Sequence, residues 1–258
     1  MSVITLTTDM GNSGFYVASV KAAIVRGLPD ANIIDITHSI RPFHVSSAAF
    51  IIRNVYKQFP EGTIHIVAVD ALNSPNSKVI AIKTEGHYFI GPDNGLFSLV
   101  FSNPPAEVYE ITITQDNTSL AFTAKDIMAK TAVHIAKGSS MADIGQEYKN
   151  HTQLTAWQPI YNDATIRTSV VYVDEYGNCI FNLEKDLFDR VGRGRKFSVD
   201  VKRNPVETIS NTYNDVSGGE LVALFTGSGL LEIAINRGNI SELLGLKEGD
   251  SVLITFEN

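Results

Sequence analysis

The sequence predicts an α/β N-terminal domain with a mainly parallel sheet, followed by a small all-β, barrel-like C-terminal domain. Over about the first 150 residues, short apolar runs alternate with segments whose apolar residues recur at helical spacing. Later apolar runs are separated by turn residues with little helix, which indicates a small antiparallel barrel or sandwich. The periodicity breaks between residues 153 and 163, so we predict domains at 1–157 and 158–258.

The first elements are a strand, a polar loop and a helix. A β-branched run at 3–7 ends at Thr8 and Asp9, and Gly11 follows in the loop. The next segment shows helical spacing of its apolar residues, which are Val17, Val20, Ile24 and Leu28. This order is the first unit of an alternating α/β layer.

The same alternation continues along the chain. We expect further strands at 32–37, 64–70, 79–84 and 87–92, and further helices at 45–59 and 126–139. In the C-terminal domain we expect strands at 165–174, 177–183, 196–201, 221–229, 230–236 and 250–256.

Composition limits the possible functions. The chain has 258 residues, 44% of them apolar and 19% charged, which is typical of a folded protein. The net charge is -7 and Lys and Arg are scattered, so no nucleic-acid partner is expected. One cysteine and six dispersed histidines predict no metal site. No leader pattern and no apolar run of roughly 20 residues occurs, so we expect a cytoplasmic protein without a membrane partner.

Several common catalytic motifs are missing from the sequence. It has no GxGxxG after a strand, no GxxxxGK[ST], no HExxH and no GxSxG. Without these motifs, the sequence gives no support for a dinucleotide enzyme, a nucleoside triphosphatase, a zinc protease or an α/β-hydrolase. The sequence therefore predicts no bound cofactor.

Two acids follow apolar runs in the predicted α/β domain, Asp9 and Asp70. Ligands of open α/β sheets collect at the carboxyl ends of strands, and a carboxylate there can accept both hydrogen bonds of a ribose diol. Alternatively, each Asp caps a turn or a helix. His38 also follows a strand, and it is either a ligand or base, or a residue that satisfies local backbone groups.

Three turns offer further candidates. Asn94 lies in an Asn-Gly turn, which favours a structural role over ligand contact. Asp174, Tyr176 and Asn178 surround Gly177 between two strands; they either form a turn or present an aromatic face and an amide to a planar heterocycle. The glycines of residues 226–239 either let backbone approach a ligand or form bends of a barrel.

Six segments together resemble one family. They are "TTDMG", "DITHSIRPF", "FPEGTIHIVAVD", "FIGPDNGL", "VDEYGNCIFN" and "LLEIAINRGN…LLGLKEGD". Their order and spacing resemble those of the S-adenosylmethionine (SAM) hydroxide adenosyltransferases, relatives of fluorinases and chlorinases. The resemblance runs nearly end to end, and it favours the ligand interpretation of Asp9 and Asp174 over the capping one.

The resemblance implies a homotrimer that binds SAM or adenosine between the N-terminal domain of one subunit and the C-terminal domain of its neighbour. By matching motif, Asp9 would bind the ribose diol and Phe43 would lie near the sugar. Asp174 would meet the methionine amino group beside the 227–228 turn. The remaining implied substrate contacts are Asn73, Asn94, Tyr176, Asn178, Ser228, Asn236 and Arg237, with the adenine held by Tyr176, Asn178 and backbone of 235–237.

The chain departs from the family at the residues that activate water. Hydrolytic members resemble one another in using an Asp, an Arg and a His. Asp70 matches the Asp, but Ser77 stands at the Arg position with Lys78 beside it, and Thr123 stands at the His position. A carboxylate at Asp70 would repel an incoming halide, so halide transfer is disfavoured.

Three interpretations remain open. The first is hydrolysis of SAM to adenosine and methionine, with Asp70 orienting water, Lys78 replacing the lost cation, and Thr123 at the His position. The second is a protein that binds SAM or adenosine without turnover. The third is transfer of the adenosyl group to a different nucleophile or from a different donor.

Overall fold

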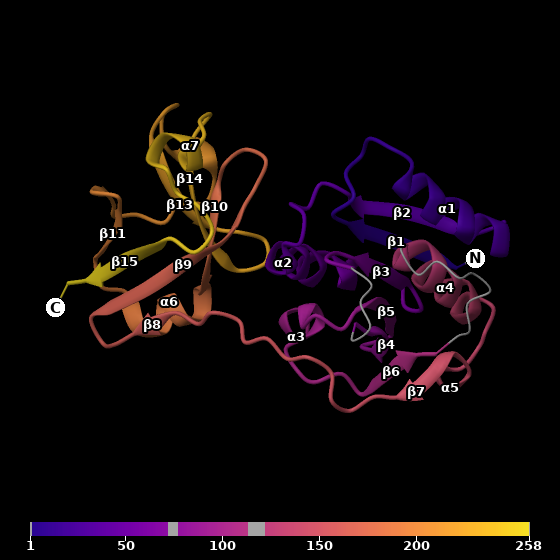
Figure 1. The fold of residues 1–258 in the computed structure, drawn as a ribbon. Coiled ribbons are helices and arrows are strands. Elements are labelled where there is room, and N and C mark those ends of the chain that lie inside the picture. Colours follow the sequence, from indigo (N-terminus) through magenta and orange to yellow (C-terminus); the bar gives the residue numbers. More distant parts are fainter. Residues whose placement is uncertain (1, 72–76, 113–121, 258) are drawn as a thin grey trace. The chain divides into compact units, whose positions relative to one another are not determined.

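A computed structural model describes residues 2–71, 77–112 and 122–257. The chain forms two compact units, Met1–Thr155 and Ala156–Asn258, and each is described by itself. Figure 1 shows the helices and strands of both units.

The first unit is built on a mixed sheet with the strand order β2-β1-β3-β5-β4-β6-β7. Strands β2, β1, β3 and β5 are parallel, whereas β4, β6 and β7 pair antiparallel. The predicted α/β domain is therefore confirmed, with its parallel pairs confined to one half of the sheet. The strands are β1 Val3–Thr8, β2 Asn32–Thr37, β3 Ile64–Ala68, β4 Val79–Thr84, β5 His87–Pro92, β6 Glu107–Ile111 and β7 Gly145–Glu147.

Helices pack on both faces of this sheet because its inner strands alternate apolar residues between the two faces. Ile4 and Ile66 belong to a core cluster that includes residues of α1 and α4, while Val67 and Phe89 belong to one that includes residues of α2 and α3. The helices are α1 Tyr16–Gly27, α2 Val45–Val55, α3 Leu96–Val100, α4 Ala129–Ala136 and α5 Met141–Ile144, with a 3-10 turn at Tyr56–Gln58 and a π-helix at Ala124–Met128.

The carboxyl ends of the parallel strands meet at one edge of the sheet. Asp9 follows β1, Asp70 lies two residues beyond β3, and Asn94 lies two residues beyond β5. Phe43 and Asp70 have positive φ values of 67° and 50°, which residues with side chains rarely adopt. Such backbone strain is common at functional sites.

The second unit is an antiparallel sheet that nearly closes on itself, which confirms the predicted barrel-like domain. Its strand order is β12-β11-β15-β9-β10-β14-β13, with β8 paired to β9. The backbone N–H of Ser210, beyond β12, donates to Ala223 of β13 at 2.7 Å, so the two edges approach each other. Its main apolar cluster includes Phe181, Ile233 and Ile254.

The elements of this unit are short. The strands are β8 Ile160–Tyr161, β9 Thr165–Val173, β10 Cys179–Glu184, β11 Phe197–Val201, β12 Asn204–Val206, β13 Leu221–Phe225, β14 Leu230–Ile235 and β15 Ser251–Phe256. The helices are α6 Lys185–Gly192 and α7 Ile240–Leu244, with a 3-10 turn at Tyr213–Asp215. Within the described residues of both units, no helix is long and apolar enough to cross a membrane.

Candidate functional site

Asp9 links three loops at the carboxyl edge of the first sheet. Its Oδ2 accepts the backbone N–H of Phe43 at 2.9 Å and the backbone N–H of Asp70 at 3.1 Å. These donors follow β2 and β3, the two neighbours of β1. Within the described residues Oδ1 accepts no hydrogen bond, so it is the oxygen available to a ligand hydroxyl.

Asp70 has the environment of a base. Partial burial and the neighbouring charge of Asp9 raise the pKa of its carboxyl group. In the described part of the chain no cation and no hydrogen-bond donor contacts this carboxylate. An acid with a raised pKa and unused oxygens at the carboxyl edge of a sheet can orient and deprotonate a water molecule.

Phe43 presents an exposed ring beside this pair of acids. The ring is 61% exposed, although its backbone N–H is held by Asp9. An aromatic side chain left in solvent next to a polar group offers an apolar surface to a ligand. This position agrees with the predicted place of Phe43 near a sugar, which stays a prediction.

Asn94 makes the contacts of a turn residue. Its Nδ2 donates to the carbonyl of Val69 at 3.1 Å, and its Oδ1 accepts the N–H of Leu96 at 3.2 Å. The side chain therefore ties the end of β3 to the start of α3. Its predicted contact with substrate stays a prediction, and the predicted contact Asn73 lies outside the described residues.

Lys78 is held away from Asp70. Its Nζ lies 2.6 Å from Oε2 of Glu110 on β6 and 4.3 Å from the ring centre of Tyr148. The hydrogen bond to Glu110 raises the pKa of Lys78. Because β5 separates β3 from β4, and β6 lies on the far side of β4, this ion pair directs the ammonium away from Asp70. Lys78 as a replacement cation stays a prediction.

Thr123 has a buried hydroxyl without a partner. The residue directly precedes the π-helix and is 5% exposed, and its Oγ1 makes no hydrogen bond within the described residues. Its neighbour Phe122 packs against the same core cluster as Met10 and Ala71, which follow the two acids. The buried hydroxyl of Thr123 could bond to a ligand or water.

In the second unit, Asp174 organises the turn between β9 and β10. Its Oδ1 accepts the N–H groups of Tyr176 and Asn178 at 2.9 and 2.8 Å, and its Oδ2 accepts the Asn178 amide at 3.1 Å. Gly177 has a φ of 80°, and a Cβ there would collide with Asn239 at 1.9 Å. The turn is thus fixed, with the Tyr176 ring 79% exposed beside it.

The other candidates of this unit lie at two ends of β14. Asn236 and Arg237 follow β14 near the Asp174 turn, since Cys179 pairs with Ile233. Ser228 precedes β14, where its hydroxyl lies 2.9 Å from that of Thr226. A six-residue strand is about 20 Å long. Asp174 and the 227–228 turn therefore lie at opposite ends of β14, and not side by side as the family resemblance implied. The two groups can contact only opposite ends of one ligand.

The sequence analysis missed a buried acid on β14. Glu232 is 4% exposed, and its Oε1 accepts the hydroxyl of Tyr213 at 2.6 Å. Burial, together with the charge of Asp174, raises the pKa of Glu232, although the bond from Tyr213 opposes this. The available signal was a single acid inside the apolar run 230–235.

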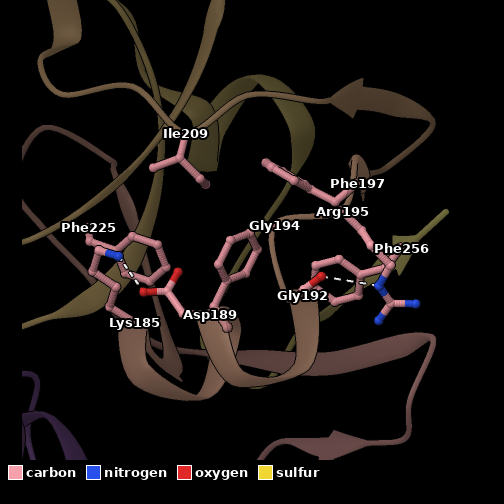
Figure 2. Close-up of a pocket in the computed structure, with 10 residues that line it drawn as sticks. Lys185, Asp189, Gly192, Gly194, Arg195, Phe197, Ile209, Phe225 and Phe256 are labelled. Atoms are coloured by element: carbon pink, nitrogen blue, oxygen red, sulfur yellow. Dashed lines mark hydrogen bonds and ion pairs between the residues drawn. The ribbon is translucent and has the colours of Figure 1, made fainter. Parts of the chain in front are cut away.

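A cavity of about 250 Å³ lies between α6 and the sheet of the second unit, and Figure 2 shows its aromatic lining. The rings belong to Phe188, Phe197, Phe225 and Phe256, with the Lys185–Asp189 ion pair at one side. It lies at the end of β10 opposite to the Asp174 turn, and none of the predicted site residues lines it. Among the described residues, no group of three or more His, Cys, Asp or Glu could hold a metal ion.

Comparison with known proteins decides the family. Residues 4–145 match the SAM hydroxide adenosyltransferase N-terminal domain, and residues 168–253 match the C-terminal domain of the same family. The chain belongs to the SAM hydroxide adenosyltransferase family. The resemblance inferred from the six sequence segments is therefore confirmed.

Individual relatives agree with this assignment. The chain is 30% identical to the (R)-S-adenosyl-L-methionine hydrolase of Thermus thermophilus, across 96% of this chain and 98% of the relative. It is 22% identical to the fluorinase of Actinopolyspora mzabensis, across 98% and 97%. A crystal structure of an uncharacterized conserved protein from Thermotoga maritima aligns with a TM-score of 0.89 at 32% identity, covering 99% of this chain and all of that one.

Proposed function

We propose that this chain hydrolyses SAM to adenosine and L-methionine by attack of water at the 5′ carbon of the ribose. The observation that carries this proposal is Asp70, whose carboxylate has a raised pKa and no protein partner within the described residues. The hydrolase relatives at 27 to 30% identity support the same reaction class.

The chemistry needs little acid catalysis. Methionine leaves a sulfonium as a neutral thioether, so no group has to protonate it. The rate then depends on in-line placement of water behind the 5′ carbon and on removal of a proton from that water. In the proposed mechanism Asp70 orients and deprotonates the water. The hydroxyl of Thr123, which has no partner among the described residues, provides a second hydrogen bond to it.

The substrate would be held by residues from both units. Asp9 binds the ribose diol beside the Phe43 ring, and Tyr176 and Asn178 bind the adenine. Asp174 binds the cationic part of the substrate. Within the described residues its carboxylate bonds only to N–H groups of its own turn and to no cation, so it is suited to this role. We propose that these halves come from neighbouring subunits of a homotrimer.

A second candidate function is binding of SAM or adenosine without turnover. It is favoured by the contacts of Lys78, whose ammonium is bound by Glu110 and Tyr148 and is therefore not free to replace the family Arg. Thr123 also cannot act as a base in the way that a histidine does. Transfer to another nucleophile is the third possibility, and product mass distinguishes it from hydrolysis.

The deciding experiment is incubation of the protein with SAM in oxygen-18 water, with and without chloride, followed by mass spectrometry of the nucleoside. We expect adenosine with heavy oxygen at the 5′ position, independent of chloride. Asp70→Asn should lose this product, whereas Asp30→Asn, which removes an exposed acid elsewhere, should retain it. Intact SAM despite measurable binding would support the second candidate, and a nucleoside of different mass would support the third.

Mixing two impaired variants tests the shared site. Asp9→Asn and Asp174→Asn should each turn over SAM only slowly when alone. If each site combines two subunits, subunit exchange between them should restore about a quarter of the wild-type activity, because one site in four then has both intact halves. If each site lies within one chain, or if light scattering shows a monomer, mixing restores nothing and the trimer proposal fails.

A further inference from the structure

A chain of polar contacts runs behind Asp9, and its central member is His38. His38 Nδ1 lies 2.9 Å from Thr8 Oγ1, and His38 Nε2 lies 3.1 Å from Asp35 Oδ1. Thr8 and His38 are 1% and 4% exposed, whereas Asp35 reaches solvent and pairs with Lys21. The contact with Asp35 is close but not aligned as a hydrogen bond, so we treat it as electrostatic.

The Asp35 carboxylate determines which groups donate and which accept along this series of contacts. A carboxylate accepts but does not donate, so the ring nitrogen that faces Asp35 carries the proton. In neutral His38 the other nitrogen, Nδ1, then accepts the hydroxyl proton of Thr8. The Thr8 Oγ1 in turn accepts the backbone N–H of Met10 at 3.3 Å. The contacts therefore lead from the protein surface to the backbone on both sides of Asp9.

His38 also holds this loop through its own backbone. Its carbonyl accepts the N–H of Gly11 at 2.8 Å. The side chain thus fixes Thr8, directly before Asp9, while the backbone fixes Gly11, two residues after it. No contact of His38 with Asp9 itself is needed to restrict where the Asp9 carboxylate points.

We propose that His38 is a positioning residue for the adenosyl ligand, which acts through Thr8 to place the Asp9 carboxylate for the ribose diol. This inference rests on the ribose role of Asp9 in the proposed function. A contact with both hydroxyls of a diol tolerates only small errors in position, so a buried hydrogen bond behind the carboxylate raises affinity for the diol specifically.

The same strand supplies a control for this effect. Thr5 of β1 makes the same kind of contact, with its Oγ1 2.8 Å from Nδ1 of the fully buried His65. Thr5 lies three residues before Thr8, and within the described residues its side-chain hydrogen bond is to His65 and not to the Asp9 loop. Replacing either Thr with Val removes one hydroxyl from one Thr–His pair, but only Thr8→Val removes it beside Asp9.

The test compares the dissociation constants of adenosine and 2′,3′-dideoxyadenosine by calorimetry. Thr8→Val and His38→Gln should weaken adenosine about three- to tenfold, as expected for one hydrogen bond, and leave the dideoxy compound unchanged. His38→Asn, whose amide can occupy the place of Nδ1, should retain most of the adenosine affinity. Thr5→Val should change neither constant.

Asp9→Asn distinguishes the ribose role of Asp9 from the positioning role of His38. If it leaves the preference for the diol intact, the ribose role of Asp9 in the proposed function is wrong. If it abolishes that preference while Thr8→Val and His38→Gln keep it, only the positioning role is overturned. Equal weakening of both nucleosides would also overturn that role, since it would indicate a general loss of structure. Should Thr8→Val not fold, the His38→Asn and His38→Gln pair decides alone.

Discussion

The two ends of the same parallel strands are used differently. At the carboxyl ends, Asp9 and Asp70 lie near each other and the described residues provide no cation for either. At the amino ends, His65 and His87 are buried, with their ring nitrogens 3.4 Å apart. Aromatic rings, including that of Phe89 stacked on His65, surround this pair.

This difference shows where the sheet is built for stability and where it is built for ligands. The imidazoles have protein partners, such as Thr5 for His65, and burial lowers their pKa values. Of the two acids, Asp70 has a raised pKa and a positive φ, and its carboxylate has no partner among the described residues. A polar group whose bonds are complete supports packing, whereas one left incomplete at a sheet edge is a candidate for chemistry.

The largest effect should come from removing the base. Asp70→Asn should lower turnover of SAM by about 10²- to 10⁴-fold, the range for a general base. Adenosine affinity should change little, since Asp9 binds the backbone of Asp70 and not its side chain. Single-turnover kinetics and calorimetry measure the two quantities, and a variant with normal turnover would remove Asp70 from the mechanism.

The pH profile of the same reaction gives an independent check. Burial and then Asp9 raise the pKa of Asp70, and only the ionised form acts as a base. The rate at saturating SAM should therefore fall on the acid side at a pH above the usual range for Asp. In Asp9→Asn one cause of the shift is gone, so this acid limb should move to lower pH. A limb that does not move would mean that another group controls it.

The second effect concerns binding. Asp9→Ala should weaken adenosine by about 1.5 to 3 kcal/mol, the range for hydrogen bonds to a charged group. The loss should be visible in the dissociation constant. An unchanged constant would show that the carboxyl end of β1 is structural, like the amino end of its neighbours, and the contrast between the two ends would disappear.

At the amino ends the expected effect is on stability. Burial, followed by the charge of His87, lowers the pKa of His65 from 6.5 to about 3. The unfolded chain then takes up the proton first, so stability is full above pH 6.5 and is lost as the pH falls toward 3. The slope is about 1.4 kcal/mol per pH unit for one imidazole.

Urea unfolding at a series of pH values measures this slope. His65→Asn removes the titrating group and keeps a polar atom toward Thr5, so its free energy of unfolding should depend less steeply on pH between 6 and 4. His87, whose pKa is also lowered by burial, should account for part of the remaining slope. Equal slopes in the variant and the wild type would show that His65 is not the group that titrates.

The smallest effect is expected for Lys78. Because its ammonium is bound by Glu110 and Tyr148, Lys78→Met should change turnover by less than about tenfold, well below the effect of a general base. A loss as large as that of Asp70→Asn would instead show that Lys78 leaves Glu110 during the reaction and replaces the family Arg. Steady-state kinetics of both variants under the same conditions make this comparison.

Sequence alone predicts the fold well where periodicity is strong. The alternation of strands and helices in the first unit and the short strands of the second are both found. The two-residue turn at Glu85 and Gly86 already implies that β4 and β5 pair antiparallel, but the sequence does not predict that β4 pairs with β6 on its other side. The local apolar pattern determines where helices and strands form, whereas the pairing of strands depends on contacts between residues distant in sequence.

The site is predicted less completely, for a physical reason. Asp9 and Asp70 can be found because each directly follows an apolar run. The ion pair of Lys78 with Glu110 and the bond between Tyr213 and Glu232 join residues 32 and 19 positions apart, so no motif reveals them. Such contacts decide whether a charge is free for chemistry.

The left-handed backbone at Asp70 has a consequence for how such proteins diverge. Asn is among the few residues that adopt this conformation readily, so Asp70→Asn leaves the loop without added strain. One nucleotide change in the first codon position converts Asp to Asn. Under the proposed function, a lineage can therefore pass in a single step between a protein that consumes its ligand and one that only binds it, with a change of chemistry and no change of fold.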